Sequence, residues 1–270
     1  MESAVLTKVS AERPLFLRDP RIQGWWLSGN VPFLCTLLLS YVYFVKSAGP
    51  RYMKNRKPLD SIKPFILVYN LAMVLSNVYF LINFLKRTYV GGGYSWFCQG
   101  IDYSAKDDTT VEVLNLCWWY LWVRVADFLD TVFFVLRKKD SHVSFLHVAH
   151  HCIVVFDGWF GLACGPDGQV ILSLCINSFI HVVMYSYYFL SLLGPAVQKH
   201  LWWKKYLTQM QITQFFVVMV HTAIPLFKDC GYPRVHVYLL VSQGAFFIVM
   251  FMNFYLKSYK KRDERLKKAQ

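Results

Sequence analysis

The sequence lacks several features that mark common classes of protein. It has 7 cysteines but no Cys-x-x-Cys pair, which argues against a zinc ribbon or a thioredoxin-type site. Gly91, Gly92 and Gly93 are not followed by Lys-Ser/Thr at the spacing of a nucleotide-binding P-loop, so they predict a flexible turn. The first 24 residues show no charged-then-apolar leader with a small-residue cleavage site, and we expect no removable signal peptide.

Acidic residues are also scarce, since 16 Asp and Glu stand against 29 Lys and Arg, for a net charge of +13. Apolar residues are abundant instead: 56% of the chain is hydrophobic and 18% is aromatic, which suits one integral membrane domain. Buried helices of a soluble protein are the alternative. Seven stretches of membrane-spanning length are predicted at residues 25–45, 64–85, 115–136, 143–160, 170–193, 206–227 and 235–256.

Most of the Lys and Arg residues lie in alternate loops and in the tail, residues 257–270. By the positive-inside rule these segments face the cytosol, which places residues 1–24 on the luminal side of a membrane domain spanning residues 25–256. Lys267 and Lys268 resemble the dilysine retrieval signal of endoplasmic-reticulum membrane proteins. Basic clusters beside a membrane set topology and contact anionic lipid, so no nucleic-acid partner is expected.

Two cysteines fall in loops predicted to face the lumen, which is an oxidising compartment where disulfides persist. We predict that these two residues, Cys98 and Cys230, bond to each other, with Cys164 as the competing partner.

The densest cluster of ionisable side chains is His147-Val148-Ala149-His150-His151, within the fourth predicted span. His147 is three and four positions from the other two histidines, so all three lie on one broad helix face. Ionisable groups inside a membrane are costly and usually serve chemistry or transport. The three imidazoles are therefore the predicted active site. The adjacent Cys152 is an alternative nucleophile, although it points about 100° away from His151 around the helix.

Polar residues of four predicted spans fall at similar depths. Counting about 1.5 Å per helical residue from the cytosolic end of each span places them about 6 to 18 Å deep. They are Arg124, Asp127, Asp130, the three clustered histidines, His181, Tyr185, Gln211 and Gln214. Such a layer suits substrates with a soluble head in the cytosol and an apolar tail in the membrane. For the two glutamines, hydrogen bonding between helices is an equally good account.

The third predicted span has an internal pattern. Arg124, Asp127 and Thr131 are spaced three and four apart, so they are expected on one stripe with Asp130 beside it. Charges in lipid must be paired, and an ion pair between helices is the structural alternative for Arg124 and Asp127. Asp130 is expected to act more directly, because a carboxylate at this depth can orient an imidazole and raise its basicity.

Four motifs in order resemble the fatty-acid elongase family, over residues 20–256. They are Arg124-x-x-Asp127-x-x-Asp130-Thr131, His147-x-x-His150-His151, Asn177 to Tyr188 with His181-x-x-Met184-Tyr185-x-Tyr187-Tyr188, and Thr208-x-x-Gln211-x-x-Gln214-Phe215. The family usually has Lys and Glu at the first two positions of the first motif. Arg124 and Asp127 keep both charges but change their reach.

The resemblance implies an all-α endoplasmic-reticulum enzyme of seven transmembrane helices around an acyl-chain tunnel. Such an enzyme, a very-long-chain 3-oxoacyl-CoA synthase, condenses acyl-CoA with malonyl-CoA and releases CO2 and CoA. We expect no permanently bound cofactor or metal ion, self-association as a homodimer, and partnership with the 3-oxoacyl-CoA reductase, dehydratase and enoyl-CoA reductase of the cycle. The expected substrate contacts are Arg124, Asp127, Thr131, Asn177, Tyr185, Tyr188, Lys204, Gln211 and Gln214.

We hypothesise that His150 attacks the acyl thioester and forms an acyl-histidine. His147 and Asp130 would orient it or accept protons, and His151 and His181 would polarise carbonyl oxygens or aid decarboxylation. Direct condensation with histidine as a base only is the rival. A metal-dependent desaturase or hydroxylase is a second function class, because His-x-x-His-His also fits iron ligation. A seven-helix transporter or receptor is a third, although paired Gly or Pro interruptions are not evident.

Overall fold

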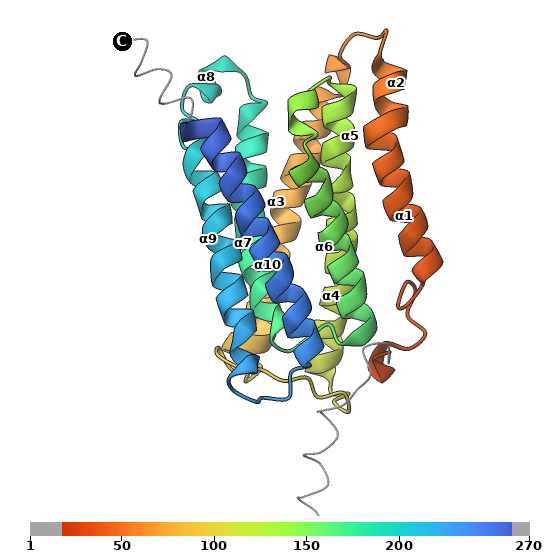
Figure 1. Ribbon diagram of the computed structural model, residues 1–270, viewed down its shortest axis with the longest axis vertical. Helices are drawn as coiled ribbons and strands as arrows, with labels where there is room; N and C mark the ends of the chain where they lie inside the picture. Colours follow the sequence, from red (N-terminus) through yellow and green to blue (C-terminus); the bar gives the residue numbers. More distant parts are fainter. Residues whose placement is uncertain (1–17, 261–270) are drawn as a thin grey trace, which may run out of the picture.

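The computed structural model describes residues 18–260, and within this range every regular element is helical. The long helices lie side by side in one bundle, with α1 at its edge beside α5 and α6 (Figure 1). The α-helices are α1 (Val31–Tyr43), α2 (Gly49–Met53), α3 (Lys63–Leu85), α4 (Asp108–Ala126), α5 (Phe128–Leu136), α6 (Phe145–Cys164), α7 (Val170–Ser191), α8 (Pro195–Gln198), α9 (Lys204–Ala223) and α10 (Arg234–Tyr255). The predicted retrieval signal at Lys267 and Lys268 lies outside the described residues.

Five stretches of the described chain are long and apolar enough to cross a membrane. They are Val31–Met53, Asp60–Val90, Phe145–Cys164, Val170–Ser191 and Arg234–Tyr259. Large apolar side chains on these stretches point outward, among them Leu39, Phe65 and Val249, and a surface of this kind suits lipid rather than water. The other two predicted spans correspond to α4 with α5 and to α9, where charged and amide side chains interrupt the apolar sequence.

The third predicted span is not one continuous helix, and this corrects the sequence-based expectation. The helix breaks at Asp127, where the backbone N–H of Asp130 donates to the Asp127 carbonyl at 3.1 Å in a tight turn. The break changes the direction of the side chains that follow it. Thr131 therefore does not share a stripe with Arg124 and Asp127 but faces α1 and α6.

Local sequence signals set the ends of the helices that carry the site. The Asp107 carboxylate accepts from the Thr110 N–H at 3.0 Å and caps the start of α4. The Ser144 hydroxyl accepts from the His147 N–H at 3.2 Å and caps α6. Such caps satisfy backbone donors that have no partner within the helix. α6 ends at Gly165, whose φ of 141° is accessible to glycine and strained for other residues.

The two ends of the bundle differ in chemistry. At one end Cys98 and Cys230 form a disulfide that joins the loop before α4 to the loop before α10. We call this the disulfide end, which is the lower end in Figure 1. The opposite end carries the lysine-rich loops that follow α2, α5 and α7, and we call it the basic end. The disulfide pair is the one that the sequence analysis proposed.

Removing the disulfide is expected to destabilise the protein substantially. The bond closes a sequence separation of 132 residues, and in the chain-entropy view a loop of this size contributes about 4 to 5 kcal/mol. Cys98→Ser should therefore lower the unfolding temperature in detergent, and reductant should lower that of the native chain to a similar value. Cys35→Ser, at an exposed cysteine, is the matched control. An unchanged unfolding temperature in Cys98→Ser would contradict the prediction.

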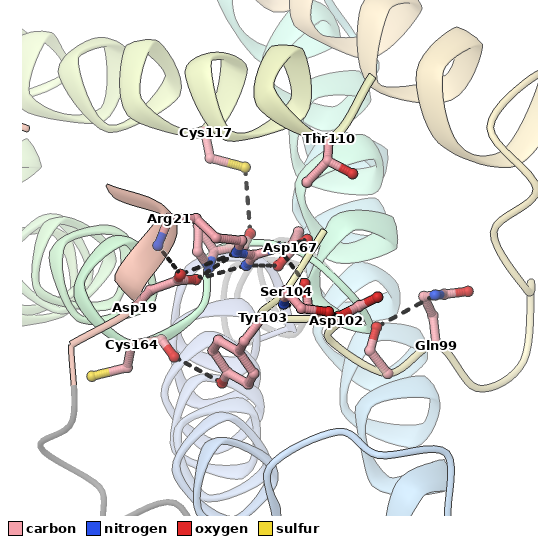
Figure 2. A network of polar contacts seen from close by, with 12 residues as sticks. Asp19, Arg21, Gln99, Asp102, Tyr103, Ser104, Thr110, Cys117, Cys164 and Asp167 are labelled. Carbon is pink, nitrogen blue, oxygen red and sulfur yellow. Dashed lines mark hydrogen bonds and ion pairs between the residues drawn. The ribbon is translucent and has the colours of Figure 1, made fainter. Parts of the chain in front are cut away.

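A buried ion network closes the disulfide end (Figure 2). The Arg21 guanidinium contacts the carboxylates of Asp19 at 2.6 Å and Asp167 at 2.8 Å, and donates to the Asp102 carbonyl at 3.0 Å. Burial alone would lower the pKa of Arg21, but the hydrogen bonds that it donates to Asp19 and Asp167 raise the pKa above its ordinary value. Because Asp19 N–H also donates to the Ala163 carbonyl at 2.8 Å, the network holds the N-terminal segment against the end of α6.

Candidate active site

The first histidine of the α6 cluster is held by a chain of hydroxyl groups. The His147 Nε2 atom lies 2.9 Å from the Thr131 hydroxyl of α5. Thr131 in turn lies 2.7 Å from the Tyr41 hydroxyl of α1. Three helices therefore fix the orientation of one imidazole. Two hydroxyls and a neutral ring can exchange donor and acceptor roles, so the chain can also pass a proton.

The other two histidines of the cluster face different surroundings. The buried His151 ring lies 4.4 Å from the His147 ring and packs near Tyr41. The His150 ring points toward α9 and α10 instead, where it lies 6.1 Å from Phe215 and 5.2 Å from Phe247. No hydrogen bond reaches the His150 ring among the described residues. The His151 ring makes no hydrogen bond among these residues either, so what distinguishes His150 is its position facing α9 and α10.

The two carboxylates of the first motif, Asp127 and Asp130, share one hydroxyl. The Tyr185 hydroxyl of α7 lies 2.8 Å from Asp127 Oδ1 and 2.6 Å from Asp130 Oδ2. Asp130 was predicted to orient an imidazole; in the structure it pairs with Tyr185, while Thr131 holds His147. The break at Asp127 explains the difference, since it turns Asp130 toward α7.

Arg124 links three helices, α3, α4 and α7, next to this cluster. Its guanidinium lies 3.1 Å from Asp127 Oδ2, 2.8 Å from Asn77 Oδ1 and 2.5 Å from His181 Nδ1. Asn177 Oδ1, 3.3 Å away, is a further acceptor. The same guanidinium nitrogen lies 3.1 Å from His181 Nε2. A guanidinium can only donate, so the His181 ring must accept. Within the described range no ring contact or hydrogen bond joins His181 to the α6 histidines, so the predicted meeting of imidazoles from separate helices is indirect.

An apolar cavity of about 180 Å³ extends from this polar layer toward the disulfide end. It lies between α4, α6, α7, α9 and α10. At one end it is lined by Arg124, Asn177 and Gln214, and at the other by Gly165 and Tyr232. Phe215 and Phe247, which contact the His150 ring, also line it. His150 is thus separated from the cavity by two aromatic side chains.

The remaining predicted site residues lie at varying distances from the layer. Gln214 is buried at the cavity, whereas the Gln211 amide lies 3.6 Å from the Met184 sulfur. The Tyr188 ring packs 5.8 Å from the Tyr185 ring. Lys204 is exposed at the basic end. The pKa of His142 is lowered there, mainly by burial of the His142 ring and also by the positive charge of Lys204.

Cys152, the alternative nucleophile, packs against an apolar cluster to which α1, α4, α5 and α6 contribute, and it is not among the residues that line the cavity. Within residues 18–260 no group of three His, Cys, Asp or Glu side chains is placed to hold a metal ion.

Sequence reasoning missed several residues of the layer. Asn77 on α3 binds Arg124, and Tyr69 on the same helix donates to the Ala126 carbonyl at 3.1 Å. Tyr41 and Asp157 were also passed over, although Asp157 lies in the fourth predicted span and lines the cavity. Polar side chains inside apolar stretches are the signal that marks Asn77 and Asp157. Nothing in the sequence pairs Tyr41 with Thr131.

Removing the Thr131 hydroxyl is expected to reduce turnover without unfolding the protein. Thr131→Val keeps the shape of the side chain but leaves His147 without its hydrogen-bond partner, and loss of an orienting bond commonly costs about tenfold or more in activity. Thr131→Ser, which keeps the hydroxyl, is the matched control. Turnover by detergent-purified protein measures the effect, and equal rates for both variants would show that Thr131 does not position the imidazole.

Comparison with known proteins identifies the family. Residues 26–267 match the model of the ELO family, described as GNS1/SUR4 family. The rat protein named very long chain fatty acid elongase 7 is 42% identical over 254 residues, covering 93% of this chain and 89% of the relative. Human very long chain fatty acid elongase 1 is 40% identical over 93% of this chain and 89% of its own length. Human very long chain fatty acid elongase 4 is 40% identical over 90% of this chain and 76% of its own length. These matches confirm the resemblance that the motifs indicated, and the chain belongs to the ELO family.

Proposed function

We propose that this protein is a very-long-chain 3-oxoacyl-CoA synthase of the fatty-acid elongation cycle. It condenses an acyl-CoA with malonyl-CoA to a 3-oxoacyl-CoA two carbons longer, with release of CO2 and CoA. The observation that carries the proposal is the position of His150. Its ring makes no hydrogen bond with another described side chain and packs against Phe215 and Phe247, which line an apolar cavity. A nucleophile beside an apolar cavity suits a thioester with a long apolar tail.

In the first stage a ring nitrogen of His150 attacks the thioester carbonyl carbon. The C–S bond breaks, and the proton of the ring passes to the departing CoA sulfur, leaving an acyl-histidine. Thr131 and Tyr41 fix His147, whose ring stacks edge-to-face with His151, so these two imidazoles are positioned to relay that proton or to polarise the carbonyl oxygen.

In the second stage malonyl-CoA loses CO2, and the electron pair of the broken bond forms an enolate. The enolate carbon attacks the acyl carbonyl, the C–N bond breaks, and His150 regains a proton. Arg124 donates to the His181 ring and so holds this imidazole in the polar layer. We assign His181 to polarising the malonyl or acyl oxygen. Asp130 and Asp127 accept hydrogen bonds from the Tyr185 hydroxyl and so fix this side chain at the edge of the polar layer.

The proposed orientation in the membrane follows from the positions of the basic loops and of the disulfide bond. We place the basic end in the cytosol, where Lys204 and neighbouring cations meet CoA phosphates, and the disulfide end in the lumen of the endoplasmic reticulum. In this arrangement α4 with α5 and α9 complete seven spans. Their polar faces turn inward, and the cavity between them forms the acyl-chain tunnel. We further propose a homodimer that works with the reductases and dehydratase of the cycle.

The proposal is tested by mixing the detergent-purified protein with acyl-CoA and labelled malonyl-CoA. The expected product is a labelled 3-oxoacyl-CoA two carbons longer, formed with one CO2 per turnover. Mixing with acyl-CoA alone should release CoA and leave an acylated protein. Condensation without any acylated protein on rapid quenching would favour histidine acting as a base only. Absence of condensation under all conditions would overturn the proposed function.

A further inference from the structure

The cavity has a polar band on a wall that is otherwise apolar. Asp157 of α6 and Gln243 of α10 both line it, and Gln243 Nε2 donates to Asp157 Oδ1 at 2.8 Å. Ser173 of α7 lines the same cavity. An acidic side chain at this depth is costly for a tunnel that would hold only hydrocarbon.

Two atoms of this band are buried without a hydrogen-bond partner among the described residues. They are Gln243 Oε1 and the Ser173 hydroxyl oxygen. Asp157 Oδ2 also takes part in no hydrogen bond within the described range. A buried acceptor left unpaired costs about 1 to 3 kcal/mol, so such atoms usually have an occupant that satisfies them. Two acceptors and one hydroxyl are complementary to a group that both donates and accepts.

The wall beside this band leaves room for an occupant. Gly158 and Gly161 follow Asp157 on α6, and both line the cavity. A Cβ atom at Gly161 would meet nothing within 4 Å, and one at Gly158 would approach the Leu121 side chain at 3.0 Å. The space beside the carboxylate is therefore open at Gly161, where α6 carries no side chain, whereas Leu121 of α4 packs closely against Gly158.

From the polar band, the open wall and the unpaired atoms, we infer that the cavity contains a subsite for an acyl chain that bears a hydroxyl group. The hydroxyl would donate to Gln243 Oε1 or Asp157 and accept from Ser173. This inference rests on the proposed function, since it assumes that the cavity holds the acyl chain.

The position of the hydroxyl follows from the helix. Asp157 lies seven residues beyond His150 on α6, which corresponds to about 10 Å along the helix axis. The subsite therefore lies part-way along a long acyl chain, away from both the thioester and the chain terminus.

The test uses acyl-CoA isomers of one chain length with the hydroxyl moved along the chain, together with the unsubstituted acyl-CoA. We expect kcat/KM for elongation to peak at a mid-chain position, about tenfold above isomers with the hydroxyl at either end, as one hydrogen bond provides. A flat profile with the unsubstituted chain still elongated would overturn the inference and leave the proposed function standing, with water as the occupant of the band. Failure to elongate any substrate would overturn both.

Two variants test whether the mid-chain maximum in kcat/KM depends on the polar band of the cavity. In Gln243→Leu the mid-chain isomer should lose about tenfold relative to the other isomers. Ser242→Ala, on the exposed face of the same helix, should keep the wild-type profile. If the peak persisted in a folded Gln243→Leu protein, the inference would be wrong. If that variant did not fold, the profile of the wild-type protein would decide alone.

Discussion

Replacing His150 with alanine is expected to abolish elongation and to prevent formation of the acylated protein. The other two imidazoles of α6 lie elsewhere: His147 is hydrogen-bonded to Thr131, and His151 packs near His147 and Tyr41 rather than against the aromatic rings that line the cavity. We therefore do not expect them to replace it. Loss of a nucleophile that acts with its neighbours commonly lowers kcat by about 10³-fold or more. Malonyl incorporation measures the rate, and intact-protein mass spectrometry after mixing with acyl-CoA measures the acylation.

The matched control is His142→Ala. His142 lies between α5 and α6 at the basic end, where its ring packs against Phe134, so its removal should leave the rate within about twofold of wild type. An unchanged unfolding temperature in His150→Ala would separate loss of chemistry from loss of fold. An acyl adduct in His150→Ala at the wild-type level would contradict the assignment and point to another imidazole.

Replacing Arg124 with methionine is expected to cause the largest loss of stability of any single change in the polar layer. Arg124 is buried and satisfies acceptors on Asp127, Asn77 and His181. Removing one partner of a buried ion pair commonly destabilises a protein by about 3 to 5 kcal/mol, because the other charge is left unpaired. Thermal unfolding in detergent measures the loss. An unfolding temperature within about 2 °C of wild type would contradict it.

A charge-preserving swap tests whether the pair acts as a unit. Arg124→Lys alone keeps the charge but loses the planar fork that reaches several acceptors at once. The family usually carries Lys and Glu at these positions, and the longer Glu side chain compensates for the donor geometry of Lys. The double variant Arg124→Lys, Asp127→Glu should therefore recover stability relative to Arg124→Lys. Additive losses in the double variant would show that the two positions are independent.

The polar layer could be predicted from the sequence because ionisable residues are rare in apolar stretches. His147, His150, His151 and His181 stand out for this reason, and depth counting placed them together with Arg124. The break at Asp127 could not be predicted, since its neighbours Ala126 and Phe128 carry no helix-breaking signal. Whether Asp130 meets an imidazole or a phenol depends on that turn.

Pairings between distant helices were also beyond the sequence. Asn77 and Arg124 meet because α3, α4 and α7 pack together, and only packing decides which acceptor reaches the guanidinium. The cavity shows the same limit. The sequence does not distinguish Gly158 and Gly161 from other helix glycines. Their place beside the cavity becomes clear only from the packing of α10, which brings Gln243 to Asp157.

A helix at the rim of an assembly is usually the part that can be removed with the least harm. Here α1 contacts the polar layer through Tyr41. The hydroxyl groups of Tyr41 and Thr131 connect this outer helix to His147. A fragment that starts at α3 would contain every histidine of the site and still leave His147 without its outer support. α1 must therefore dock against α5 and α6 before the enzyme can mature, which makes activity a measure of complete assembly.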